Sequence, residues 1–363
     1  MLNEKIGNKE AVIFIVTIII NSFLLNANKI IIENCKSSSI INTIYISFIA
    51  ILIILLVCKL FKNFPGFGLL DISKFLGGKP LQFFVGIIYI AYLGFITAVL
   101  LRKLCDCLQM IFYTMTDLIF IVFLFIIATA IIVRLNKSSI FKSTLIIFPV
   151  LALVIILSFI GNSKNFNLQN IYPLLGNGID ATFKTGFTNL FAFTGLSYLY
   201  FLPSYLSNPE KFKKISCFSI IIAGFFLILM TANILFMYSD SLSNSELFPL
   251  YIAIRYIEFG TFIQRMDSTF LLICSLSFIS YLSLNATICT NIFKTITNIS
   301  DNKPIIYPYL LCIFSISIII RNNSILDFVE NYVFKILFFG IAIILSIGIL
   351  ILANIKKNLG KER

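Results

Sequence analysis

Long apolar runs, each bounded by charged residues or by proline and glycine, recur along the whole chain. A run of about 20 apolar residues is long enough for an α-helix to cross the hydrocarbon core of a bilayer. Backbone groups in lipid must be hydrogen-bonded within the segment, and β-barrel alternation is absent, so these runs predict helices. Ten transmembrane spans are predicted, with the bounds Ala11–Ile32, Ile40–Cys58, Leu81–Leu101, Leu118–Val133, Ser143–Ile160, Gly186–Leu206, Ile215–Tyr238, Ser268–Phe293, Ile305–Ile320 and Lys335–Ala353.

The amino-acid composition strengthens this prediction. Of 363 residues, 59% are hydrophobic and only 12% are charged, whereas a soluble domain has about 25% charged residues. The mean hydropathy is +1.00. We therefore expect an all-α integral membrane protein whose ten spans leave little chain for a soluble domain.

Lysine and arginine residues are divided unequally between the two sides of the predicted membrane. The side that includes both termini has 18 of them, and the other side has 10. Because cytoplasmic loops carry the excess of Lys and Arg, both termini are predicted to be cytoplasmic. The net charge of +12 is spread over short loops, without the clustering that a nucleic-acid-binding groove requires. We expect the lipid bilayer, and not nucleic acid, as a partner.

The ten spans divide into five and five around a long polar segment. Residues 1–161 would form the first repeat, residues 162–185 a turn-rich external loop, and residues 186–363 the second repeat. Because five is odd, the second repeat starts on the opposite side of the membrane, which is the topology of an inverted repeat. Near residues 246–262 an amphipathic stretch predicts a helix along the outer interface, or equally an ordinary loop helix that covers the bundle.

The chain lacks the residues that many enzymatic and metal sites need. It has no histidine, which excludes Ser–His and Cys–His catalytic pairs and histidine metal ligands. Eight cysteines are scattered, mostly in apolar runs. The closest pair, Cys105 and Cys107, does not have the CxxC spacing of a zinc or redox motif. We therefore predict no catalytic residue, no metal site and no cofactor.

The predicted spans contain no charged residue away from their ends. Such a residue is the usual indication of a proton relay or of a counter-ion for a substrate. A ligand site would therefore be neutral, and proton coupling through a buried carboxylate is disfavoured. In the first span, Asn21, Ser22 and Asn26 interrupt the apolar run. Such residues compete with helical hydrogen bonds, so they predict local unwinding, or alternatively hydrogen bonds between helices.

The sixth span has small and polar residues ahead of a proline. Thr194, Gly195, Ser197 and Tyr198 all precede Pro203. This arrangement predicts a break in the helix whose freed amide groups could face a ligand carboxylate. The alternative is that Gly195 only allows close packing between helices.

Candidate ligand-binding residues also lie on two other spans. In the eighth span, Ser277, Tyr281 and Asn285 are spaced four residues apart and form one stripe on a helix. Since the opposite side of that helix is apolar, we expect the stripe to face protein or a cavity and not lipid. A further wall of the site is expected from three residues of the third span, Tyr89, Tyr92 and Thr97. Anchoring at the membrane interface is the alternative role for Tyr89 and Tyr92, although both lie well inside the predicted span.

Several segments of the chain resemble a known family. Phe248–Ile257, followed by Phe262–Ser268, resembles the region before the eighth span of spore germination permeases, and Gln264–Asp267 is its most specific part. Leu168–Leu175 and Pro203–Leu206 are also similar to that family. The family comprises the B subunits of nutrient germinant receptors in endospore-forming bacteria, and the likeness in span layout extends over most of the chain.

The resemblance implies an amino acid permease-like fold of the amino acid–polyamine–organocation superfamily, with ten helices in a five-plus-five inverted repeat. It also implies a protein that senses germinants such as amino acids at the spore inner membrane, together with an A subunit and a C-subunit lipoprotein. The ligand site would lie on the first, third, sixth and eighth spans. Two features differ from the family pattern. Asn21 and Ser22 stand where relatives have a glycine-rich break, and Leu196 and Ser197 stand near an acidic position of the sixth span.

These observations favour a non-enzymatic membrane subunit of a germinant receptor, which binds a small germinant, an amino acid, and triggers germination. An amino acid secondary transporter (a permease) of the same superfamily is the alternative. An intramembrane enzyme is a third hypothesis. It is the weakest of the three because the spans show no activated nucleophile and no general base.

Overall fold

The computed structural model describes residues 5–134, 137–238, 249–255, 257, 266–299, 303–320 and 323–359. Within these ranges the chain is helical without a β-strand, and all ten predicted apolar runs fall largely on helical backbone. The α-helices are α1 (Asn8–Ser22), α2 (Asn28–Cys35), α3 (Ser39–Phe61), α4 (Leu69–Ile111), α5 (Leu118–Val133), α6 (Lys137–Gly161), α7 (Leu196–Leu199), α8 (Leu202–Tyr205), α9 (Phe212–Met237), α11 (Pro249–Arg255), α12 (Met266–Thr297), α13 (Lys303–Ile319), α14 (Asn323–Phe328), α15 (Phe334–Leu337) and α16 (Ser346–Leu359).

Short segments of other helix types connect several of these helices. The π-helical segments are Phe23–Ala27, Asp180–Thr185, Val329–Val333 and Phe338–Leu345. The 3₁₀ segments are Lys36–Ser38, Asn162–Asn165, Leu168–Ile171, Gly186–Phe193 and Pro209–Lys211. Two of the π-helical segments join α14, α15 and α16, so that the last apolar run continues as one long helix.

Seven described helices are long and apolar enough to cross a membrane. Two further apolar helices, Leu118–Val133 and Pro304–Ile319, are shorter. The predicted sixth span consists of the 3₁₀ segment Gly186–Phe193 and the short helices α7 and α8. An all-helical membrane protein is therefore confirmed, whereas the ten-span inverted repeat and the three predicted domains stay predictions.

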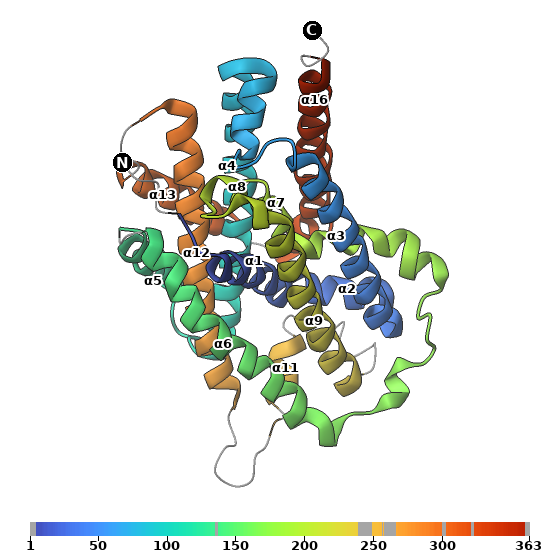
Figure 1. Ribbon diagram of the computed structural model, residues 1–363. Coiled ribbons are helices and arrows are strands. Elements are labelled where there is room, and N and C mark those ends of the chain that lie inside the picture. The colour runs from blue at the N-terminus through green and yellow to red at the C-terminus, as the bar shows by residue number, and fades with distance from the viewer. Residues whose placement is uncertain are drawn as a thin grey trace.

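The most buried helices lie at the centre of the bundle. In the most apolar window of α1 and in that of α12, 72% of the residues are buried, compared with 33% in α6 and in the last helix. The helix α1 packs against α6, α9 and α12, and in Figure 1 it lies across the middle of the molecule. The helix α12 also packs against α4, α5 and α6. Candidate residues on α1, α4 and α12 are thus placed in the protein interior, away from lipid.

The helix α4 is longer than the predicted third span at both ends. It has non-helical backbone angles at Gly77 and Gly78, where Gly78 has φ +72°, a value that residues with a Cβ rarely adopt. Beyond this kink the helix continues to Ile111, ten residues past the predicted end at Leu101. The extension includes Lys103, which the sequence pattern had left outside the span.

The segment between the predicted repeats and the segment before the eighth span are both partly helical. Residues 162–185 contain short helical segments and turns, with positive φ at Gly176 and Gly178. The helix α11 lies within the predicted interfacial stretch 246–262, most of whose remainder is outside the described residues. Tyr251 of α11 donates a 3.0 Å hydrogen bond to the Asp267 carboxylate of α12. Burial, together with the bond to Asp267, raises the pKa of Tyr251 to about 12.

We expect cysteine labelling to place the α3–α4 turn on the cytoplasmic side. In a variant without the native cysteines, cysteines at Asn63 and Asn208 should be shielded from an impermeant thiol reagent added to intact cells. Cysteines at Thr114 and Ser163 should react. All four side chains are exposed in the structure. Whether each cysteine reacts therefore depends on the side of the membrane on which it lies. The opposite pattern would contradict the orientation inferred from the unequal division of Lys and Arg.

Candidate functional site

The first and sixth predicted spans depart from regular α-helix close to their candidate residues. In the first span the backbone after Asn21 and Ser22 widens into the π-helical segment Phe23–Ala27. The expected unwinding is therefore not found there, because the chain remains helical from Asn8 to Cys35. A π-helical segment is often found at functional sites, because it re-aims the side chains next to it.

The backbone of the sixth span is wound more tightly than an α-helix and does not break open. The backbone N–H groups of Ser197 and Tyr198 bond to carbonyl oxygens three residues earlier, at Thr194 and Gly195. The N–H of Phe201 bonds in the same way to Tyr198. These amide groups are thus satisfied within the segment, and the prediction that they are free to face a ligand is not supported.

Hydrogen bonds connect the candidate residues of α1 to those of α12 and of the sixth span. The Asn21 amide donates to the hydroxyl of Ser277 at 2.8 Å. The Thr194 hydroxyl donates to that of Ser22 at 2.9 Å. All four side chains are less than 5% exposed. The structure therefore brings the polar residues of three predicted spans together in the bundle interior.

A second set of contacts joins α4 to the sixth and eighth spans. The hydroxyl of Tyr92 lies 3.0 Å from that of Ser197, and the hydroxyl of Thr97 lies 3.1 Å from that of Tyr281. Tyr198 makes an edge contact with the ring of Phe14, with the ring centroids 5.9 Å apart. Together with the two bonds made by α1, these pairs connect the first, third, sixth and eighth predicted spans in one closed ring of neutral donors and acceptors.

Asn285 is the most connected residue of this network. Its amide donates to the Leu93 carbonyl at 3.1 Å and to the hydroxyl of Thr97. Its carbonyl oxygen accepts from the Tyr309 hydroxyl at 2.9 Å and from the Cys289 thiol at 3.0 Å. Sequence reasoning missed Tyr309, although a tyrosine inside the apolar run Ile305–Ile320 was a signal that could have found it.

Two candidate residues face away from the network. The Tyr89 hydroxyl contacts that of Ser346 on α16, a residue that the sequence pattern did not single out. A Cβ at Gly195 would lie 2.4 Å from Cγ1 of Ile19 on α1. Since real Cβ atoms do not approach side chains so closely, the geometry at Gly195 favours the packing alternative over open space for a ligand.

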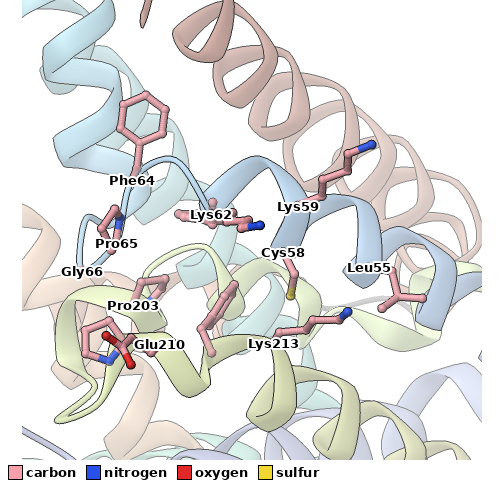
Figure 2. A pocket seen from close by; sticks show the side chains of 13 residues that line it. Leu55, Cys58, Lys59, Lys62, Phe64, Pro65, Gly66, Pro203, Glu210 and Lys213 are labelled. Atoms are coloured by element: carbon pink, nitrogen blue, oxygen red, sulfur yellow. The ribbon is translucent and has the colours of Figure 1, made fainter.

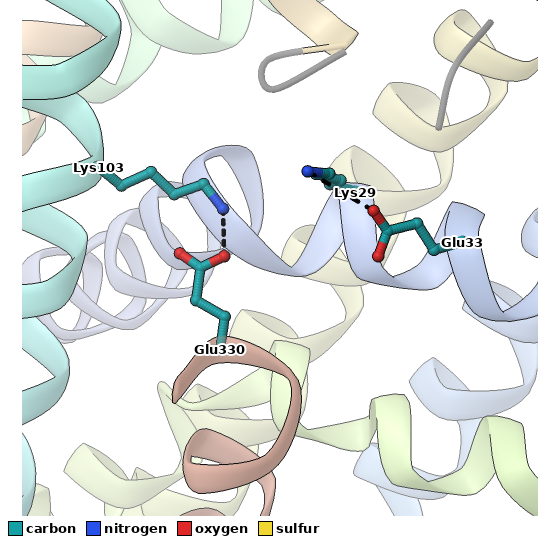
Figure 3. A network of polar contacts seen from close by, with 4 residues as sticks. All are labelled: Lys29, Glu33, Lys103 and Glu330. Atoms are coloured by element: carbon teal, nitrogen blue, oxygen red, sulfur yellow. Dashed lines mark hydrogen bonds and ion pairs between the residues drawn. The ribbon is translucent and has the colours of Figure 1, made fainter. Parts of the chain in front are cut away.

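One buried ion pair lies just beyond the ends of the predicted spans, on helices that are longer than those spans (Figure 3). Lys103 of α4 and Glu330 of the last helix lie 2.5 Å apart, and their side chains are 5% and 2% exposed. The sequence pattern placed both outside the spans, because Arg102 and Lys103 end one apolar run and Lys335 begins another. Lys29 and Glu33, at 3.6 Å, form a more exposed pair on α2 nearby.

A polar cavity of about 460 Å³ lies at one end of the network. It is lined by Asp71, Ser204, Tyr205, Asn291 and Lys294, among others. Asn291 lies on α12, six residues after Asn285. None of the twelve predicted site residues lines this cavity, and all twelve are buried.

Comparisons with known proteins identify relatives of the chain. A family model described as spore germination protein matches residues 5–327, a range that includes every candidate site residue. Spore germination protein KB of Bacillus subtilis (strain 168) is 24% identical over 252 residues, 68% of this chain and 67% of that protein. Spore germination protein B2 of the same organism is 22% identical over 220 residues, 60% of each chain.

Proposed function

Because the chain belongs to the spore germination protein family, we propose that it is a membrane subunit of a nutrient germinant receptor. In this proposal it binds a small germinant, an amino acid, and triggers germination without catalysing a reaction. Its partners are the A subunit and the C-subunit lipoprotein of such a receptor. It resides in the spore inner membrane as a ten-span inverted repeat with both termini in the cytoplasm.

The observation that carries the proposal is the buried network of neutral polar side chains. Polar groups in a membrane bundle are costly to bury, yet this network joins the first, third, sixth and eighth spans. Asn21, Thr97 and Asn285 provide amide and hydroxyl groups, which hydrogen-bond both the carboxylate and the ammonium of a zwitterion. A neutral site suits a ligand without net charge, because its carboxylate and ammonium balance each other and hydrogen bonds from the site can solvate each end.

We infer that germinant binding exchanges these internal hydrogen bonds for bonds to the ligand. The pairs Tyr92–Ser197 and Ser22–Thr194 hold the sixth span against α4 and α1. A ligand that takes their place favours a second packing of the spans, because it binds that packing more tightly. The change in packing would be transmitted to the A subunit.

The alternative is an amino acid secondary transporter of the same superfamily. One observation favours it, namely the polar cavity around Tyr205 and Asn291, which extends the polar side of α12 towards one membrane face. Uptake of labelled amino acids by proteoliposomes distinguishes the two functions. Accumulation driven by an ion gradient would establish transport, and binding without accumulation supports the receptor.

Removing one network hydroxyl should weaken the germinant response without loss of protein. Ser197→Ala removes a hydroxyl that the bound germinant would use once it has displaced Tyr92, and one such hydrogen bond to the ligand is worth about 0.5–1.5 kcal/mol. The germinant dose-response of spores should therefore shift by roughly 2- to 12-fold. Ser219→Ala on α9 is the matched control, because Ser219 is equally buried and bonds only to its own helix, at Ile215. An equal shift in both variants, or a loss of protein with Ser197→Ala, would contradict a ligand-site role.

A further inference from the structure

A second cavity, of about 730 Å³, opens where α3 ends and α9 begins (Figure 2). Three lysines line it, Lys59 and Lys62 near the end of α3 and Lys213 in the first turn of α9. None of the twelve candidate residues of the proposed ligand site lines this cavity. The cavity is therefore separate from the proposed germinant site.

The charges around this cavity are unbalanced. Three lysines face one carboxylate, that of Glu210, which gives the lining a formal charge of 3 − 1 = +2. In Figure 2, Glu210 lies beside Pro203 at one end, whereas the three lysines are grouped towards the other end. The ion pairs of the described chain lie elsewhere, on α2, on α4 and between α4 and the last helix. The exposed ammonium groups are available to an anion.

The wall beneath the lysines is apolar and continues onto the membrane surface. Leu55 and Phe61 line the cavity, and Phe61 makes an edge contact with Phe212 of α9 at 5.4 Å. From Leu55 an exposed apolar row follows α3 into the membrane through Leu52 and Phe48, which are 50% and 59% exposed. These residues are spaced three or four positions apart, so they share one side of the helix.

We propose that this cavity binds an anionic phospholipid, with the headgroup phosphate on Lys59, Lys62 and Lys213. The acyl chain lies along the apolar row of α3. Basic pockets between helix ends recognise anionic headgroups in this way. A soluble phosphate would use the lysines and leave the apolar row without a function, so the continuity of the two surfaces favours the lipid.

A single tryptophan can report this binding, because the chain has none. Leu55→Trp places the fluorophore in the cavity wall, where a brominated acyl chain would quench its emission. The full chain is reconstituted in phosphatidylcholine with a fixed fraction of brominated phosphatidylglycerol, or of brominated phosphatidylcholine as the neutral reference. We expect roughly 30-fold preference for phosphatidylglycerol, as two uncompensated lysines at an anionic headgroup imply. Phe84→Trp, at a lipid-facing position of α4 that is 64% exposed, should show little preference.

Charge-matched variants separate this site from general attraction to anionic lipid. The triple variant K59Q/K62Q/K213Q should remove most of the preference at the Leu55→Trp reporter. K74Q/K79Q/K214Q removes three exposed lysines outside the cavity and should retain the preference. Equal quenching by the two brominated lipids, or an equal loss in both triple variants, would overturn the proposal. Displacement of the lipid by millimolar inorganic phosphate at constant ionic strength would assign the site to soluble phosphate instead.

Discussion

Lys103→Met should strongly reduce the amount of folded protein in the membrane. The substitution leaves the Glu330 carboxylate buried without its cation, and the second oxygen of that carboxylate, Oε1, already has no hydrogen-bond partner. Removing one member of a buried ion pair costs about 3–5 kcal/mol, a large part of the stability of a typical protein. The measurement is the melting temperature of the detergent-solubilised chain, together with its abundance in membranes.

Replacing both members of the pair is expected to be far less damaging. The double variant with Lys103→Met and Glu330→Leu leaves no charge buried at this position. Such apolar replacements of a buried ion pair are often neutral or stabilising. Glu33→Gln is the control, because the Lys29–Glu33 pair is partly exposed and such i,i+4 pairs are worth about 0.3–0.5 kcal/mol. If the double variant melts as low as Lys103→Met alone, the ion pair does not account for the loss.

The same ion pair shows why the sequence predicts helices better than their ends. Apolar runs located the helices, because a segment in lipid must satisfy its own backbone. Lys103 ended the predicted third span, since an unpaired lysine in a helix interior is unfavourable. The helix continues because Glu330 neutralises that lysine from 227 positions away in the sequence. A pattern that is read along one segment contains no information about such a partner.

The candidate site was predictable as a list of residues but not as a set of contacts. Asn21, Ser277 and Asn285 stood out because polar residues are rare within apolar runs. Their partners depend on how the helices cross, so the sequence pattern does not find Tyr309 and does not decide between a ligand-facing break and close packing at Gly195. The short distance between Gly195 and Ile19 exists only in the packed bundle.

Gly195→Ala should destabilise the chain by crowding α1, and shortening Ile19 should relieve this effect. The new methyl group would lie 2.4 Å from Cγ1 of Ile19, and overpacking of this kind costs about 1–3 kcal/mol. Ile19→Ala alone removes buried atoms and leaves a cavity, at a cost of about 2–5 kcal/mol. Together, the two substitutions add volume at residue 195 and remove volume at residue 19, on the two sides of one contact. We therefore expect the double variant to melt higher than the sum of the single effects predicts, which indicates direct coupling.

The comparison of stability with germinant response then decides what Gly195 does. Gly348→Ala on α16 is the control, because no atom lies within 4 Å of the added Cβ, and its melting temperature and response should both stay near those of the unmodified chain. For a packing residue, Gly195→Leu removes the protein from the membrane, and Gly195→Ala costs less stability in a chain that already carries Ile19→Ala than in the unmodified chain. The opposite result would place Gly195 in the ligand site. In that case Gly195→Ala is present at normal abundance but does not respond to germinant, and adding Ile19→Ala does not restore the response. The network of Asn21, Thr97 and Asn285 would then have to open beside the sixth span, where Gly195 now contacts α1.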